Sequence, residues 1–83
     1  MKLHILKIEK QYFYLVCSQQ KKAELRQDDR NYEVYDLIHF VDVEGKEFVN
    51  YKDNLYMITN ILRNVHAYGL MHGYAMLSIK KVQ

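Results

Sequence analysis

The chain has 83 residues, of which 49% are hydrophobic and 27% are charged, and its formal net charge is +2. This length suits one small domain over residues 1–83, and the apolar content excludes a largely disordered chain. The nearly balanced charge argues against a protein that grips long nucleic acid through many phosphates, although a small or local nucleic-acid ligand remains compatible with it.

The N-terminal half predicts a strand, a helix and a second strand, in that order. Leu3–Ile8 is short and rich in β-forming residues. Apolar residues recur at helical spacing in Glu9–Ser18, which predicts an amphipathic helix. Ala23–Arg26 alternates strictly between apolar and charged side chains, which predicts a half-buried strand whose charged face meets solvent. The composition of Asp28–Asn31 then indicates a turn.

The C-terminal half predicts three more strands. Leu37–Val43 is apolar on both faces, so we expect it to be central in the sheet. Glu44–Glu47 favours a hairpin turn, after which Phe48–Val49 would add a few paired residues. Leu55–Leu62 and Gly73–Lys80 are β-rich runs, and Ala75, Leu77 and Ile79 share one face of the second run. A polar loop over residues 63–67, with His66, separates them.

Five or six strands and a single early helix do not alternate along the chain, which argues against a doubly wound parallel sheet. We therefore expect an α+β fold: a small, open, mostly antiparallel β-barrel with one N-terminal helix packed across it. Curling into a barrel would also hide the sheet edges of a chain that has no proline to protect them.

The cysteine count, the spacing of the histidines and the length of the apolar runs limit the cellular compartment and the metal chemistry that we expect. One cysteine, Cys17, excludes an internal disulfide and indicates a reducing, cytoplasmic environment. The longest apolar run, Tyr12–Cys17, is far shorter than the ~20 residues that span a bilayer, so no membrane partner is expected. The four histidines are His4, His39, His66 and His72. Their spacing matches no zinc pattern, so neither a metal nor another cofactor is expected.

The most charged part of the chain runs from Lys21 to Arg30, where seven charged residues lie within ten positions. Such a run usually forms a solvated strand face whose charges pair with one another. If that face instead lined a concave cleft, Lys21, Glu24 and Arg26 would form a polar site with both donors and acceptors. Tyr74, which follows a glycine at the start of a strand, is a candidate for stacking on a base.

The segment from Lys21 to Asp36 resembles the signature of the ASCH domain (activating signal cointegrator homology) of the PUA-like superfamily. The matching letters read K-x-x-E-x-R-x-x-D-R-x-Y-x-V-x-D. His4–Lys7, Phe48–Leu62 and Tyr68–Ile79 resemble other parts of the family pattern, so the similarity covers nearly the whole chain. It is greatest to short, stand-alone bacterial and phage-borne members.

This chain departs from that pattern at two glycine positions. Tyr35 stands at the glycine before the final aspartate, and Gln19 stands at the glycine that ends the helix. If these positions need a positive φ, Tyr35 is strained, because side chains other than glycine rarely adopt that conformation.

The resemblance implies an open barrel with a cleft beside the helix that binds RNA or a modified nucleoside. It implies that Lys21, Glu24 and Arg26 line this cleft, with Lys7 and His4 nearby. The candidate ligand- or RNA-binding residues are therefore His4, Lys7, Lys21, Glu24, Arg26, Arg30 and Tyr74. The partner would be RNA or a base-containing small molecule. The sequence leaves the oligomeric state open and is compatible with a monomer.

Two other functions remain as alternatives. Some ASCH relatives are small amidohydrolases that act on N4-acylated cytidine-like nucleosides with a threonine nucleophile and a lysine. Lys21 matches the lysine, but the threonine position holds Glu24, and a carboxylate cannot act as a hydroxyl does. The sequence therefore leans against catalysis and predicts no catalytic residue. The further alternative is a protein-interaction adaptor.

Overall fold

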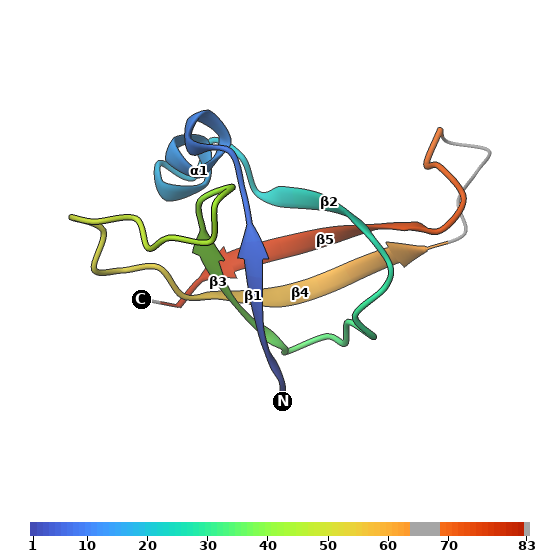
Figure 1. Ribbon diagram of the computed structural model, residues 1–83. Helices are drawn as coiled ribbons and strands as arrows, with labels where there is room; N and C mark the ends of the chain where they lie inside the picture. The colour runs from blue at the N-terminus through green and yellow to red at the C-terminus, as the bar shows by residue number, and fades with distance from the viewer. Residues whose placement is uncertain (64–68, 83) are drawn as a thin grey trace.

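The computed structural model describes residues 1–63 and 69–82, which form one curled sheet and a short helix (Figure 1). The elements follow in the order β1 (Leu3–Lys7), α1 (Lys10–Cys17), β2 (Ala23–Gln27), β3 (Leu37–Val41), β4 (Tyr56–Arg63) and β5 (Tyr74–Lys81). These are the helix and five of the strands predicted from local periodicity. The loop expected over residues 63–67, with His66, lies beyond Arg63 outside the described residues. No described helix is long and apolar enough to cross a membrane.

The sheet has five strands in the order β1-β3-β4-β5-β2. β1 and β3 run parallel, whereas the other three neighbouring pairs are antiparallel. The sheet is therefore mixed, and the expectation of a mostly antiparallel one was wrong in this respect. The physical reason is the crossover connection that parallel neighbours require. The chain leaves β1, forms α1 and the far edge strand β2, and only then returns beside β1 as β3.

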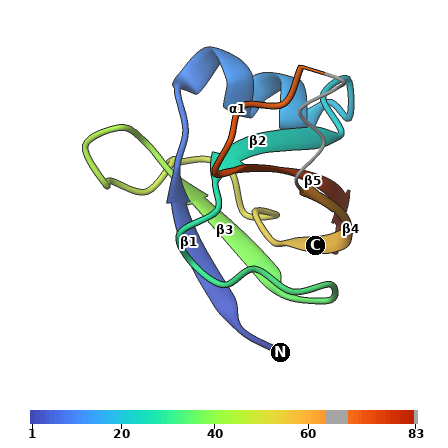
Figure 2. The ribbon, with the colours of Figure 1, turned by 90° about the vertical axis from the view of Figure 1, so that its right-hand side faces the viewer.

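The sheet curls into an open barrel whose two edge strands, β1 and β2, approach each other below the helix (Figure 2). We call the gap between these two edges the seam. Arg26 of β2 spans it, because its Nη2 donates to the main-chain oxygen of Lys7 in β1 at 2.5 Å. The α+β open barrel expected from the sequence is thus present in outline, and β3 lies inside the sheet as predicted.

The core lies between α1 and the concave face of the sheet. Phe13 and Val16 are the buried residues of α1. They join inward side chains of the strands, including Leu6, Ile38, Phe40, Tyr56, Ile58, Ala75, Leu77 and Ile79. The shared inner face that the sequence predicted for the last three of these is confirmed.

A tight turn closes over Asp42–Lys46, close to the turn expected at Glu44–Glu47, but among the described residues no strand follows it before β4. Asp42 organises this turn, because its Oδ1 accepts from the amides of Glu44 and Lys46, both at 2.9 Å. Phe48 stacks on Phe13 of α1, with ring centroids 4.0 Å apart and planes 7° from parallel. The strand pairing expected for Phe48–Val49 was therefore wrong, since burial against the helix takes its place.

The two positions where the ASCH pattern has glycine both adopt the left-handed conformation. Gln19 has φ +63° immediately after the helix, and Tyr35 has φ +77° just before β3. The Tyr35 amide donates to the main-chain oxygen of Ile58 at 2.8 Å, which holds this conformation. The strain expected for a side chain at position 35 is therefore present in the structure.

Candidate functional site

A cleft of about 620 Å³ opens along the seam, bounded by the end of β1, the start of α1, β2 and the loop that follows β2. Six of the seven candidate residues line it: Lys7, Lys21, Glu24, Arg26, Arg30 and Tyr74. These residues come from both edge strands, the segments that precede and follow β2, and the start of β5, so the curl of the sheet brings them together. The cleft is the candidate functional site.

The charged side of β2 was predicted to face solvent, and the structure shows the opposite orientation. Glu24 is 6% exposed and Leu25 is 55% exposed, so the charged side faces inward. In the β2–β5 register Glu24 lies opposite the buried Leu77, and Arg26 lies opposite the buried Ala75. The charged face can be buried because its charges neutralise one another within the cleft.

Glu24 occupies the middle of this charge cluster. Its Oε2 accepts from Arg26 Nε at 2.8 Å, and Arg26 Nη2 lies 2.6 Å from the same oxygen. Its other oxygen, Oε1, accepts from Lys21 Nζ, which also donates to the main-chain oxygen of Ala23. Both carboxylate oxygens are therefore engaged, and the three side chains hold one another in place.

Two arginines cap the free edge of β1. Arg26 Nη2 donates to Lys7 O at 2.5 Å, and Arg30 Nη1 donates to Ile5 O at 3.0 Å. The guanidinium groups thus satisfy carbonyl oxygens that a sixth strand would otherwise pair. A guanidinium has five N–H donors, so donors of both arginines remain for a ligand in the cleft.

Tyr32 forms an aromatic wall of the cleft and is 2% exposed. Burial raises the pKa of its phenol, against the opposing charges of Arg26 and Arg30, so the phenol stays protonated near neutral pH. His4 packs behind this ring, with centroids 4.7 Å apart. His4 is itself buried and lies near the cleft without lining it, so its part in ligand binding stays a prediction. Its contact with Tyr32 supports the aromatic wall of the cleft from behind.

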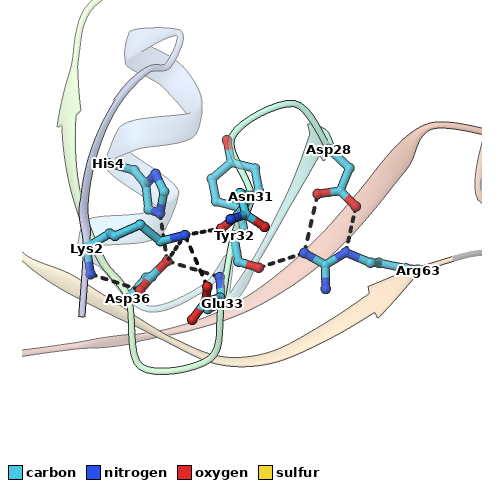
Figure 3. A network of polar contacts seen from close by, with 8 residues as sticks. All are labelled: Lys2, His4, Asp28, Asn31, Tyr32, Glu33, Asp36 and Arg63. Atoms are coloured by element: carbon cyan, nitrogen blue, oxygen red, sulfur yellow. Dashed lines mark hydrogen bonds and ion pairs between the residues drawn. The ribbon is translucent and has the colours of Figure 1, made fainter.

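The polar network behind Tyr32 is centred on Asp36 (Figure 3). His4 Nε2 donates to Asp36 Oδ2 at 2.8 Å, and the amides of Lys2 and Glu33 donate to the two carboxylate oxygens at 2.9 and 3.0 Å. Burial raises the pKa of Asp36, but these hydrogen bonds and the charge of Lys2 outweigh burial and lower it to about 2. Asp36 is therefore an ionised buried acceptor that anchors the loop bearing Tyr32.

A second ion pair fixes the other end of that loop (Figure 3). Arg63 Nε lies 2.6 Å from Asp28 Oδ2, and Arg63 Nη2 donates to the main-chain oxygen of Tyr32 at 2.6 Å. The hydrogen bond to Asp28 raises the pKa of Arg63. Tyr32, Asp36 and Arg63 were not among the functional residues predicted from the sequence. The ASCH-like motif carried a signal for the first two, but none marked the pairing of Asp28 with Arg63, which lie 35 positions apart.

Further lining residues were also missed. Glu9, Tyr12, Gln27 and Asp29 complete the polar and aromatic boundary of the cleft. The cleft therefore offers ammonium and guanidinium donors, a central carboxylate and three tyrosine rings within one space. Within residues 1–63 and 69–82, no group of three or more histidine, cysteine or acidic side chains could hold a metal ion.

The comparisons with known proteins place the chain in a family without assigning it a function. A family described as a domain of unknown function (DUF3850) matches residues 3–79. The match covers nearly the whole chain, which therefore belongs to this family. No curated protein matches the sequence.

Proposed function

We propose that the chain is an ASCH-type, PUA-like binding module whose cleft recognises a nucleoside or the end of an RNA. The observation that carries this proposal is the buried carboxylate of Glu24, held between Lys21 and Arg26 at the centre of a concave site. A carboxylate held in this way can accept from an exocyclic amino group, as carboxylates do with cytosine N4.

The surroundings of Glu24 supply the other contacts that such a ligand needs. The rings of Tyr12 and Tyr74, which line the cleft and are at least partly exposed, offer faces on which a base can stack, and the buried ring of Tyr32 forms the wall behind them. Donors of Arg26 and Arg30 that are not used on β1 can bind phosphate or carbonyl oxygens. A single half-buried cysteine supports a cytoplasmic setting for this binding.

The proposal is tested by calorimetric titration of the four ribonucleoside monophosphates at about 50 and 200 mM salt. We expect binding of at least one of them, and a loss of about tenfold or more in affinity for Arg26→Gln, because a charge-assisted contact is removed. Lys46→Gln is the matched control, since Lys46 is an exposed cation outside the cleft. Absence of binding by the wild-type protein at low salt contradicts the proposal.

One contact favours an amide hydrolase as the second candidate. Lys21 and Glu24, the positions that match the lysine and threonine of hydrolytic ASCH relatives, touch each other in the cleft. In that case Glu24 would orient or activate a water molecule and Lys21 would act as the base. Turnover of N4-acetylcytidine, followed by mass spectrometry and lost in Lys21→Gln, would establish this activity. Binding without turnover leaves the binding module.

A further inference from the structure

A second concave site of about 270 Å³ lies where β2 begins and β5 ends. Four lysines line it: Lys21, Lys22, Lys80 and Lys81. The two strands are antiparallel neighbours, and Ile79 N donates to Lys22 O at 3.0 Å. This register brings the start of one strand beside the end of the other and so gathers lysines that are nearly 60 positions apart. We call these four residues the lysine site.

Among the residues that the structure describes, no acidic side chain lines the lysine site. In the part of the chain that the structure describes, Lys22, Lys80 and Lys81 form no ion pair. Like charges held close together repel, so this arrangement lowers the free energy of any anion that enters it. Lysine ammonium groups act as point charges that suit the phosphates of a nucleic-acid backbone.

The lysine site adjoins the cleft. Lys21 lines both, because its side chain runs from the lysine site toward Glu24, where its ammonium group is engaged. An extended ligand can therefore occupy the cleft at one end and pass its charged backbone over Lys22, Lys80 and Lys81.

We propose that the lysine site binds the phosphodiester backbone of a single-stranded oligonucleotide whose terminal nucleotide occupies the cleft. This inference rests on the proposed function and extends it from a single nucleotide to a strand. The modest net charge of the whole chain is compatible with it, because Lys22, Lys80 and Lys81 gather three positive charges at one end of the sheet.

The apolar residues of the lysine site favour a strand over an anionic membrane surface. Val16, Tyr56 and Ile79 lie at its base and are 2%, 2% and 8% exposed. A surface that binds membranes combines cations with apolar side chains that protrude into the bilayer. Here the apolar side chains are already buried in the core, and the site is recessed.

The test compares a cytidine monophosphate with a single-stranded ten-nucleotide oligocytidylate, each titrated between about 50 and 200 mM salt. The variant is Lys80→Gln/Lys81→Gln. The control is Lys10→Gln/Lys46→Gln, which removes the same charge from α1 and the β3–β4 loop. We expect the decamer to bind the wild-type protein more tightly than the monophosphate. The variant should reduce the salt slope for the decamer by about 1.4, or about 0.7 for each lost phosphate contact. Its affinity for the monophosphate should be unchanged.

The outcomes separate this inference from the proposed function. If the monophosphate binds but variant and control have the same decamer slope, the lysine site is refuted and the cleft stands. If neither the decamer nor any of the four ribonucleoside monophosphates binds, both fail. The last measurement is binding of the protein and its variants to phosphatidylserine vesicles. Binding to them that depends on Lys80 and Lys81, with no effect of these residues on the decamer, would refute the strand and indicate a membrane surface.

Discussion

Replacement of Glu24 by glutamine tests whether the charge cluster of the cleft also stabilises the fold. Glutamine keeps the shape but replaces one carboxylate oxygen with an amide that donates hydrogen bonds. Either Lys21 or Arg26 then faces a donor instead of an acceptor. Because Glu24 is buried, the cation that loses its acceptor cannot find another one at this position without a rearrangement of the site.

The expected loss in the free energy of unfolding follows from the burial of Lys21, Glu24 and Arg26. Removing one partner of a fully buried ion pair costs about 3–5 kcal/mol. The side chains of Lys21 and Arg26 are 27% and 21% exposed, so both can regain some water, and we expect a cost of about 2–3 kcal/mol. For a domain of this size the corresponding fall in Tm is about 10–20 °C.

The assay is thermal unfolding followed by circular dichroism, with Glu33→Gln as the matched control. This control makes the same chemical change at a site where the side chain is 65% exposed and forms an ion pair with Lys2 at 3.4 Å. The control should lose less than about 1 kcal/mol. If both variants melt within about 3 °C of the wild-type protein, the cluster contributes no net stability, and the reasoning is refuted.

Three further changes test other interactions that hold the fold. Asp36→Asn should destabilise the protein at about pH 7 but much less at about pH 2.5 by urea unfolding. Because the folded-state pKa lies near 2, below the ordinary 3.8, the ionised carboxylate stabilises the fold above pH 3.8 and this stabilisation is lost as the pH falls toward 2. An equal loss at both pH values contradicts this. Tyr35→Gly should raise the stability by about 1 kcal/mol, because the φ of +77° no longer strains a side chain, and a lower Tm would count against it. Asn54→Ala should cost about 2–3 kcal/mol in chemical denaturation, because the side chain of Asn54 pairs with both backbone groups of the buried Phe40. A loss below about 0.5 kcal/mol would show that another group satisfies them.

Local pattern and composition were enough to place the helix and the five strands, because helical spacing, alternation and β-forming residues are properties of a few neighbouring positions. It also identified the inner face of β5. The motif from Lys21 to Arg30 led to most of the cleft, since charged residues at strand spacing share one side of the strand whatever the rest of the fold does.

Alternation alone does not say which side of a strand faces the core, and β2 shows the consequence. Its charged side lies inside because Lys21, Glu24 and Arg26 neutralise one another there, leaving Leu25 exposed. The mixed sheet likewise depends on which strands pair, and β1 pairs with a strand more than 30 positions away. His4 needed its partner Asp36, 32 positions along the chain, before its supporting place behind the cleft could be known. Such contacts form only when distant segments meet, and no local pattern records them.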